Sequence, residues 1–538
     1  MNHYTGFLNV YKERGMSSMA VCARIRRILD VAKAGHAGTL DPMAEGVLPV
    51  ALGKACKSCD EAGGGRKTYR AGMLLGVTTD TQDVTGTELS RYEGELPSEE
   101  EIRNVLLSFV GDYDQLTPMY SARQVDGKRL YEIAREGKEV DRAVKTVEIM
   151  DLTIEKIDLP HVVFSVTCSR GTYVRTLCHD AGEKLGCGAC MESLVRTSVG
   201  DFRVEEALTT EQVKELSENG GIDRELRVIT PTAVAIGKFD GTHLGHRKLL
   251  RELRKSAEKH HLRSLVLILD TQGKSVEDRA LRKEKILSMG IDYCIEYELD
   301  EELMRMSAEA FLREILIGKL SMKFMVAGKD IAFGKGREGN EEFLRKHAAE
   351  YGFTFKLIDK LKDGEDGPVI SSTVVRDLIR NGDVEKAGQL LGAPWSVTGV
   401  VEHGKHIGTD VLGVPTVNIA VPDDRELPPY GVYVTETMVT CDAEKQIRND
   451  ITAPKNKDAA VYGSISNLGV RPTAEDGRPA TLETALFGDP GDLYGKTVEI
   501  RFLRYLRPER KFGSFEELKE QMTKTDIPEA QKYLQSRK

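Results

Sequence analysis

The sequence predicts a multidomain protein: an α+β domain, a doubly wound α/β domain and a C-terminal β-barrel domain. Three observations support this prediction. The chain has 538 residues, which at roughly 150 residues per domain is enough for three or four domains. Its 40% hydrophobic and 30% charged residues are typical of globular chains that bury sizeable cores. The strand and helix pattern changes twice, which places the domains at 1–227, 228–388 and 389–538.

The first segment mixes the periodicities of strands and helices, which is typical of an α+β domain. Residues 162–169 (VVFSVTCS) carry a strand pattern, whereas residues 100–109 (EEIRNVLLSF) carry a helical one. The polar, glycine-bearing stretch at 217–226 interrupts both periodicities, and an apolar strand follows it. We therefore expect the first domain to end at about residue 227.

Short apolar strands then alternate with helices up to about residue 385, as at 234–239, 264–269 and 324–328. This alternation predicts a doubly wound parallel sheet, whose ligands bind beyond the carboxyl ends of the strands. After Ala393-Pro394-Trp395 the chain has many short strands with Gly/Pro turns and one terminal helical run. That pattern predicts a small β-barrel.

The charge and hydropathy patterns exclude several classes of function. A net charge of -9 argues against general adhesion to nucleic acid, and so against DNA as a partner; any RNA contact has to be local and shape-selective. No stretch approaches the roughly 18 apolar residues of a membrane span, and the first residues lack the pattern of a signal peptide. We therefore expect a cytoplasmic protein with no membrane partner.

The nine cysteines form no small disulfide-dense segment, which fits reduced thiols. Two pairs, Cys56/Cys59 and Cys187/Cys190, formally match a zinc pattern, but the pairs are much farther apart than in a zinc ribbon. We interpret them as free thiols.

A glycine-flanked loop, GHAGTLDPMAEGVLP at 35–49, is the most unusual local feature of the first segment. Its Asp41-Pro42 step presents one carboxylate in a tight turn, with the imidazole of His36 upstream. These residues alone leave two interpretations open, an ordinary turn with a capping aspartate and a functional carboxylate.

Beyond that loop, the first segment resembles the tRNA pseudouridine synthase B family over about 9–210. The loop and its continuation to residue 57 look like the catalytic motif of that family. Further blocks of the family follow in order: Lys67-Thr68-Tyr69-Arg70, LLGVTTDTQDVTG, Pro118-Met119-Tyr120-Ser121-Ala122, GKRLYEIAREGKEV and CSRGTYVRTLCHDAGEKLGCGA.

The resemblance implies an enzyme that converts the T-loop uridine at position 55 of tRNA to pseudouridine without a cofactor. Asp41 would be the nucleophile, Tyr69 would stack on the flipped base and take part in proton transfer, and Arg175 would pair with Asp41. The residues implied in substrate binding are His36, Tyr173 and Leu194.

A histidine pair, His243 and His246, lies at the turn between a strand and a helix in the second segment. Imidazoles and helix-terminal amides at such a turn suit ATP phosphates, although a structural histidine pair is the alternative. The segment 370–376 (ISSTVVR) supplies hydroxyls and a guanidinium for the same phosphates. The expected ATP-binding residues are His243, His246, Ser371, Ser372, Thr373 and Arg376.

Together these motifs resemble the adenylyltransferase half of bacterial bifunctional riboflavin kinase/FAD synthetase. One departure from that family is serious. The family usually carries a Phe-x-Pro-His-Pro loop after the second strand, whereas this chain has LDTQGK at 269–274. Whether the domain adenylylates FMN is therefore left open by the sequence.

The third segment resembles the riboflavin kinase half of that family through Gly408-Thr409 and the run GVPTVN at 413–418. The resemblance implies that Thr416 and Asn418 hold Mg²⁺ and nucleotide phosphates, and that Glu483 is the base that activates the ribityl hydroxyl. The alternative is a β-barrel with Gly/Pro turns and no such role.

The whole sequence is thus interpreted as a fused enzyme with pseudouridine synthase, riboflavin kinase and FAD synthetase activities. Its expected partners are tRNA, riboflavin, FMN and ATP, and the flavin reactions need Mg²⁺ and ATP. Two competing interpretations stay open. The first segment could bind or fold RNA without turnover, and the second could be a silent scaffold.

Overall fold

The structure of the protein is a computed structural model that describes the backbone of residues 2–121, 124–125, 128–130, 133, 140–271, 273–402, 415–439, 460–469 and 480–537. The chain forms two compact units, each described by itself below. The first unit contains residues 1–231 with 318–321, and the second contains 232–317 with 322–538.

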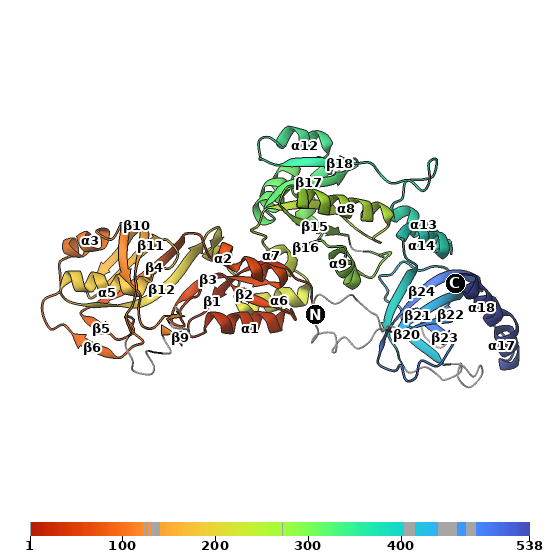
Figure 1. The fold of residues 1–538 in the computed structure, drawn as a ribbon, viewed down its shortest axis with the longest axis horizontal. Helices are drawn as coiled ribbons and strands as arrows, with labels where there is room; N and C mark the ends of the chain where they lie inside the picture. The colour runs from red at the N-terminus through yellow and green to blue at the C-terminus, as the bar shows by residue number, and fades with distance from the viewer. Residues whose placement is uncertain are drawn as a thin grey trace. The chain divides into compact units, whose positions relative to one another are not determined.

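A mixed sheet forms the centre of the first unit, in the order β1-β3-β12-β4-β11-β10-β7 (Figure 1). Short strands β2 and β13 extend it at β3 and β12. Neighbouring strands are antiparallel except β12 and β3, which are parallel. The strands are β1 (Gly6–Lys12), β2 (Ala34–His36), β3 (Glu45–Leu52), β4 (Lys67–Leu75), β7 (Gly111–Leu116), β10 (Val144–Asp158), β11 (His161–Cys168), β12 (Ala189–Val199) and β13 (Phe202–Arg203).

Two short hairpins and several helices complete the first unit. The hairpins pair β5 (Val77–Thr79) with β6 (Glu88–Arg91), and β8 (Gln124–Val125) with β9 (Lys128–Arg129). The helices are α1 (Ser18–Ile28), α2 (Cys59–Ala62), α3 (Glu99–Leu107), α5 (Val174–Leu185), α6 (Thr210–Asn219) and α7 (Ile222–Glu225), with 3-10 turns at Gly53–Ser58 and Val204–Glu206.

Local signals explain where these helices begin and end. The Ser17 hydroxyl caps α1 by accepting a hydrogen bond from the Ala20 N–H at 3.2 Å. A reciprocal capping box between Thr209 and Gln212 begins α6. Gly186 ends α5 with φ of 75°, a left-handed conformation that glycine adopts without strain.

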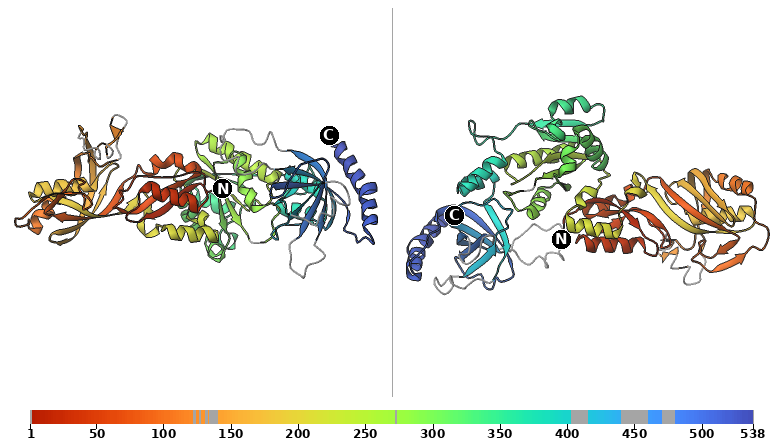
Figure 2. Two further views of the ribbon diagram at one scale, coloured as in Figure 1. Left: turned by 90° about the horizontal axis from the view of Figure 1, so that it is seen from below. Right: turned by 180° about the vertical axis from the view of Figure 1, so that it is seen from behind.

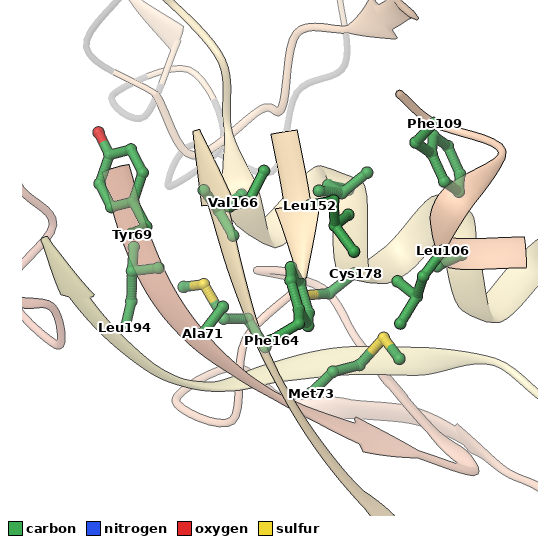
Figure 3. Packing of buried hydrophobic residues seen from close by; sticks show 14 of the residues in the cluster. Tyr69, Ala71, Met73, Leu106, Phe109, Leu152, Phe164, Val166, Cys178 and Leu194 are labelled. Carbon is green, nitrogen blue, oxygen red and sulfur yellow. The ribbon is translucent and has the colours of Figure 1, made fainter. Parts of the chain in front are cut away.

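The core of the first unit lies between α3, α5 and the central strands. Figure 3 shows this packing, with Met73 and Phe164 from the sheet against Leu106 of α3 and Cys178 of α5. Tyr69 of β4 belongs to the same buried cluster. The core therefore fixes the strand that carries one of the predicted site residues.

The second unit begins with a parallel sheet in the order β16-β15-β14-β17-β18. The order reverses at β14, so the topological switch point lies between β14 and β17, where such sheets bind ligands. The elements are β14 (Thr232–Gly237), α8 (Leu244–Lys259), β15 (Arg263–Asp270), α9 (Arg279–Ser288), β16 (Tyr293–Glu298), α10 (Glu301–Arg305), α11 (Ala308–Ala310), a π-helical segment (Phe311–Lys319), β17 (Met322–Gly328), a 3-10 turn (Lys335–Arg337), α12 (Glu341–His347), β18 (Thr354–Ile358), α13 (Ser372–Arg380) and α14 (Val384–Leu391).

An antiparallel sheet follows, in the order β19-β24-β21-β22-β23-β20. A backbone hydrogen bond from the Glu402 N–H to the Asn418 carbonyl, 2.9 Å long, connects its two ends. The elements are β19 (Trp395–Val400), β20 (Thr416–Ala420), β21 (Gly431–Val439), β22 (Val461–Gly469), β23 (Thr481–Leu486), β24 (Thr497–Pro508), α17 (Phe515–Gln521), a π-helical turn (Met522–Asp526) and α18 (Ile527–Ser536).

Two cores hold the antiparallel sheet. On one side Val432 and Ile465 pack against Ala530 of α18, the helix that lies beside the strands in both views of Figure 2. On the other side, Val397 and Leu482 share one buried cluster with Val375 of α13. The helices that end the parallel-sheet domain are therefore packed into the core of the antiparallel sheet.

Among the described residues, every helix is too short or too polar to cross a lipid bilayer.

Candidate active sites

The turn that carries Asp41 follows β2 and precedes β3. Leu40 is fixed by Ser18, because its N–H donates to the Ser18 hydroxyl at 2.9 Å and its carbonyl accepts from that hydroxyl at 3.1 Å. The Ala44 N–H donates to the Asp41 carbonyl at 3.0 Å and closes the turn. The Asp41 side chain is 35% exposed, so a substrate can reach its carboxylate.

Arg175 at the start of α5 binds this carboxylate. Its Nη1 lies 3.2 Å from Asp41 Oδ2 and 3.8 Å from Asp83 Oδ2, and its Nη2 donates to the Tyr120 carbonyl. Asp83 in turn accepts hydrogen bonds from the N–H and the hydroxyl of Thr85. The predicted Asp41–Arg175 pair is present, and Asp83 joins it as a third member.

Tyr69 and Arg196 are direct partners in the register of β4 and β12. Both side chains are buried, and Leu194 lies on β12 opposite Ala71. Burial raises the pKa of Tyr69, and the neighbouring Arg196 guanidinium partly offsets that rise. Figure 3 shows Tyr69 and Leu194 together at one edge of the cluster, and their role in binding a base stays a prediction.

The Arg196 guanidinium binds the backbone of the loop that carries Asp41. It donates to the carbonyls of Val47 at 2.8 Å, Gly38 at 3.0 Å and Thr39 at 3.3 Å. A Cβ on Gly46, whose φ is +102°, would lie 2.3 Å from the Arg196 carbonyl oxygen. Glycine is therefore required where the loop passes Arg196.

Lys12 supports the same loop from β1. The side chain is fully buried, and its ammonium donates to the carbonyls of Ala44 at 2.5 Å and Pro42 at 3.2 Å. Burial lowers the pKa of Lys12 to about 8, although the nearby Asp41 carboxylate favours the charged form. Two buried cations thus hold the backbone on both sides of Asp41.

The other two predicted substrate residues lie at the edges of this site. Tyr173 is fixed by Gln115, whose side-chain amide bonds both its N–H and its carbonyl, and its ring centroid lies 5.8 Å from the Arg175 guanidinium carbon. His36, at the end of β2, is partly buried and its Nδ1 has no partner among the described residues. Burial lowers the pKa of His36, which favours the neutral ring.

In the second unit, the two predicted histidines stack at the start of α8, with ring centroids 3.7 Å apart. The His246 N–H donates to His243 Nδ1 at 3.2 Å, and His246 Nδ1 lies 3.2 Å from the Gly241 carbonyl. Burial lowers the pKa of His243 to about 3 and that of His246 to about 4. Both rings are therefore neutral at pH 7, and His243 carries its proton on Nε2.

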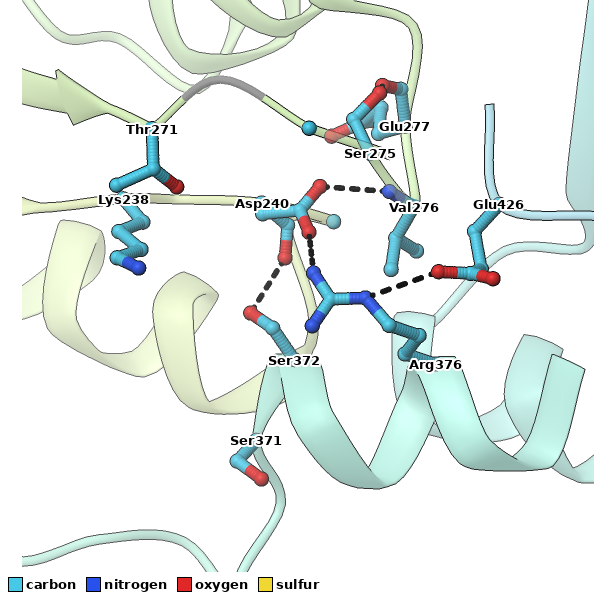
Figure 4. A network of polar contacts seen from close by, with 12 residues as sticks. Lys238, Asp240, Thr271, Ser275, Val276, Glu277, Ser371, Ser372, Arg376 and Glu426 are labelled. Carbon is cyan, nitrogen blue, oxygen red and sulfur yellow. Dashed lines mark hydrogen bonds and ion pairs between the residues drawn. The ribbon is translucent and has the colours of Figure 1, made fainter. Parts of the chain in front are cut away.

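The segment that contains Ser371 and Arg376 meets the end of β14 (Figure 4). The Ser372 hydroxyl donates to the Asp240 carbonyl at 2.6 Å, and Arg376 Nη2 donates to Asp240 Oδ2 at 2.7 Å. The Ser371 hydroxyl caps α13 by accepting from the Val374 N–H. Of the three predicted hydroxyls, those of Ser371 and Ser372 are thus engaged within the protein, and Ser372 and Thr373 both line a hollow.

This hollow lies at the carboxyl ends of β14 and β15, next to the switch point of the sheet. Six cationic side chains line it, together with Asp240, Asp270 and Glu426: Lys238, Lys274, Arg279, Arg282, Arg376 and Arg380. The excess of positive charge fits a polyphosphate ligand. The loop that lacks Pro-His-Pro borders the hollow through Thr271, Gly273 and Lys274.

In the antiparallel sheet, Glu483 of β23 is the register partner of Asn418 on β20 and of Asn467 on β22. Paired residues on neighbouring strands project to the same face, so these three side chains are neighbours. Thr416 lies two residues before Asn418 and therefore on the same face. Residues 408, 409, 413 and 414 of the predicted signature lie outside the described residues.

The described cysteines are all free thiols. Within the described part of the chain, no three His, Cys, Asp or Glu side chains are arranged so that they could hold a metal ion. Burial raises the pKa of Cys59 to about 11, so this thiol is protonated at pH 7. The interpretation of both cysteine pairs as metal-free stays a prediction.

Comparisons with known proteins assign a family to each part of the chain. Four family models match in order: TruB family pseudouridylate synthase (N terminal domain) at 26–174, tRNA pseudouridylate synthase B C-terminal domain at 175–236, FAD synthetase at 227–374 and Riboflavin kinase at 391–534.

Curated relatives agree with the first two models. The chain is 46% identical over 217 residues to tRNA pseudouridine synthase B of Geobacter sulfurreducens, which covers 40% of this chain and 71% of the relative. It is 38% identical over 289 residues to tRNA pseudouridine synthase B of Clostridium perfringens strain 13. That alignment covers 52% of this chain and 98% of the relative. The chain belongs to the tRNA pseudouridine synthase B family, and FAD synthetase and riboflavin kinase domains follow the synthase part.

Among solved structures, one described as a macrolide-efflux protein from Streptococcus pneumoniae is 25% identical, with a TM-score of 0.48, and covers 57% of this chain and 95% of that chain. The family assignment rests on the sequence comparisons.

Proposed function

We propose that the synthase part converts uridine 55 in the T-loop of tRNA to pseudouridine, with the Asp41 carboxylate as nucleophile. The observation that carries this proposal is the 3.2 Å ion pair between Asp41 and Arg175 in a turn that leaves Asp41 partly exposed. A protein that only binds RNA needs no such buried arginine against an accessible carboxylate. The geometry therefore favours an enzyme over an RNA-folding module.

The reaction is an isomerisation, so no atom is gained or lost overall. The N1–C1′ bond of the uridine breaks, the uracil turns and a C5–C1′ bond forms. C5 gives up its proton, and N1 takes one up. Asp41 would attack the flipped nucleotide while Arg175 holds its carboxylate. The ring of Tyr69 offers a stacking surface and its hydroxyl a proton-transfer group, and Leu194 closes the pocket beside it. His36 and Tyr173 would bind the surrounding RNA, and no cofactor takes part.

We propose domain boundaries at 1–227, 228–388 and 389–538, and a cytoplasmic location with no membrane or DNA partner. The parallel sheet is then a doubly wound nucleotidyltransferase domain, and the antiparallel sheet is a small β-barrel. The hydrogen bond between Glu402 and Asn418 supports the barrel, because it connects the first and last strands of the order.

For the third domain we propose Mg-ATP-dependent conversion of riboflavin to FMN. The Thr416 hydroxyl and the Asn418 amide oxygen fit Mg²⁺, because both are hard oxygen donors on one face of β20. The ion would neutralise phosphate charge during transfer. Glu483, the register partner of Asn418, would act as the base for the ribityl hydroxyl.

For the second domain we propose adenylylation of FMN to FAD with ATP. The cationic hollow at the carboxyl ends of β14 and β15 supports it, with Arg376 and Thr373 on its wall. The stacked pair His243 and His246 at the start of α8 is not part of that wall, and its role in binding ATP is part of the proposal. The alternative is a silent scaffold, because the Pro-His-Pro element is missing. Lys274 borders the hollow, and its ammonium group would replace the lost donor.

One experiment tests these proposals together. The purified chain is incubated with riboflavin and Mg-ATP, and separately with an unmodified tRNA transcript, and FMN, FAD and pseudouridine are quantified. Pseudouridine at position 55 together with FMN and FAD is the expected result. FMN that accumulates without FAD would show that the second domain is a scaffold, and a transcript left unmodified would contradict the synthase assignment.

A further inference from the structure

A short segment of the third domain, Asp424 to Glu426, pairs with a loop of the second domain. The Ser275 N–H donates to the Asp424 carbonyl at 2.7 Å, and the Glu426 N–H donates to the Ser275 carbonyl at 2.8 Å. Two backbone hydrogen bonds therefore join the domains at the loop that borders the cationic hollow.

The carboxylate of Glu426 continues this contact into the ATP-binding motif. It is 4% exposed and accepts hydrogen bonds from Arg380 Nε at 2.8 Å and Nη2 at 3.0 Å. Its Oε2 also lies 3.3 Å from Arg376 Nε. Because Arg376 Nη2 is bound to Asp240 at 2.7 Å, the guanidinium is held between a carboxylate of its own domain and one of the next domain (Figure 4).

This arrangement leaves one edge of Arg376 for a ligand. Its third guanidinium nitrogen, Nη1, makes no such contact with the described residues, and the side chain lines the hollow. A guanidinium held by a hydrogen bond at one nitrogen and by an ion pair at a second presents its remaining N–H groups to a phosphate with little loss of side-chain entropy.

Arg279 holds the loop at 269–274 against the third domain through contacts of three of its nitrogens. Its Nη2 donates to the Gly273 carbonyl at 2.7 Å, its Nε lies 3.1 Å from Asp270 Oδ2, and its Nη1 donates to Asp424 Oδ2 at 3.2 Å. The loop that replaces the Pro-His-Pro element of the family is thus held partly by the third domain.

Buried contacts show that this docking is part of the folded unit. The indole N–H of Trp395 donates to the Val276 carbonyl at 2.8 Å, and Trp395 is 2% exposed. The Arg425 guanidinium carbon lies 5.4 Å from the centroid of the Trp395 ring, and Arg425 donates to the Ser396 carbonyl at 2.7 Å. Val375, which precedes Arg376 on α13, packs in the same core as Trp395.

We propose that Glu426 is a positioning residue for adenylyl transfer: from the kinase domain it fixes Arg376 at the ATP hollow. The adenylyltransferase site is then complete only while the kinase domain is docked on it. This inference rests on the proposed FMN adenylylation, and its test therefore includes a measurement that does not need FAD.

The test compares the full-length chain with Glu426→Gln, which keeps the size of the side chain and removes its charge. The matched control is Glu499→Gln, because Glu499 is paired with Arg501 on β24 of the same domain. FAD formation from FMN and FMN formation from riboflavin are measured over a range of ATP concentrations. Amide hydrogen exchange of 273–279 and α13 is followed with and without ATP.

We expect Glu426→Gln to lower kcat/KM for FAD formation by about 10- to 100-fold, with a raised KM for ATP, because Arg376 loses its fixed position. FMN formation should stay within about twofold, and Glu499→Gln should change neither reaction. Exchange in α13 should become faster in Glu426→Gln, and the protection by ATP should weaken. An unchanged ratio of FAD to FMN formation would overturn the proposal.

Two further outcomes are also decisive. If the parent chain makes no FAD, the proposed adenylylation is wrong. The inference about Glu426 is then tested by hydrogen exchange alone: weaker protection of α13 by ATP in Glu426→Gln supports it, and unchanged protection contradicts it. Should Glu426→Gln fail to fold, Glu426→Asp replaces it, because the charge is kept and only its reach is shortened. An intermediate FAD to FMN ratio is expected for Glu426→Asp, and a parental ratio would contradict the positioning role.

Discussion

Arg175 Nη1 lies 3.2 Å from Asp41 Oδ2, and the same nitrogen lies 3.8 Å from Asp83 Oδ2. The two carboxylates differ in access, since the Asp41 side chain is 35% exposed and that of Asp83 is 4% exposed. One arginine thus joins a carboxylate that substrate can reach to one that it cannot. The accessible Asp41 suits a nucleophile, and the buried Asp83 suits a residue that orients Arg175.

The first prediction concerns the nucleophile. Asp41→Asn should abolish pseudouridine formation, because an amide cannot replace the carboxylate in attack on the nucleotide. Binding of tRNA should stay within a few-fold, since the stacking and phosphate contacts remain. The measurement is pseudouridine formed on an unmodified transcript, beside a filter-binding assay. Turnover by Asp41→Asn near the parent rate would remove Asp41 from the mechanism.

The second prediction concerns Asp83. Asp83→Asn should lower the rate of pseudouridine formation by about tenfold, because Arg175 loses a charged partner and holds Asp41 less firmly. The effect should be on kcat more than on the KM for tRNA. Asp158→Asn serves as the control, since Asp158 is an exposed residue paired with Lys156 on the surface. Equal rates in the two variants would assign Asp83 to the fold alone.

Much of the synthase site could be predicted because its residues lie in local motifs. Asp41 and its loop are one continuous string, and Tyr69 and Arg175 each lie within a block of the family. Arg196 and Asp83 were missed as site residues. The role of Arg196 depends on the register of β12 against β4, which places it beside Tyr69, and no local pattern encodes that register.

In the flavin domains, too, the sequence does not predict contacts between residues that are far apart along the chain. The motifs located His243, Arg376 and Glu483, but they gave no sign that Glu426 would reach Arg376 from another domain. Such a contact depends on how two folded surfaces meet. The sequence also assigns Ser371 and Ser372 to phosphate binding. In the structure the Ser371 hydroxyl caps α13 and the Ser372 hydroxyl donates to the Asp240 carbonyl, and the role of both residues toward ATP stays a prediction.

The third prediction concerns the kinase base. Glu483→Gln should remove most of the rate of FMN formation with little change in riboflavin affinity, because a base acts in the transition state more than in binding. Steady-state kinetics and riboflavin fluorescence titration measure the two quantities. Glu499→Gln on β24, which β21 and β22 separate from β23, should leave the rate within about twofold. A parent-like rate in Glu483→Gln would move the catalytic role to another residue.

The fourth prediction concerns the cysteine pairs. Protein purified without chelator should contain no stoichiometric zinc, because the described thiols are free and no set of metal ligands surrounds them. Elemental analysis checks this directly. Zinc near one ion per chain that disappears in Cys187→Ser would show that the pairs are metal ligands after all.

The last prediction uses the neutral histidines of the second domain. The pKa of His243 is lowered by burial to about 3, against an ordinary value of 6.5. Between these two values the unfolded chain binds a proton that the folded chain does not, so stability is lost as pH falls from about 6.5. His243→Asn removes this titration and keeps a helix cap, because asparagine is a preferred N-cap residue. Its thermal midpoint should therefore fall less than that of the parent between pH 7 and pH 5. An equal fall in His243→Asn and in the parent would show that His243 does not titrate on unfolding in this range.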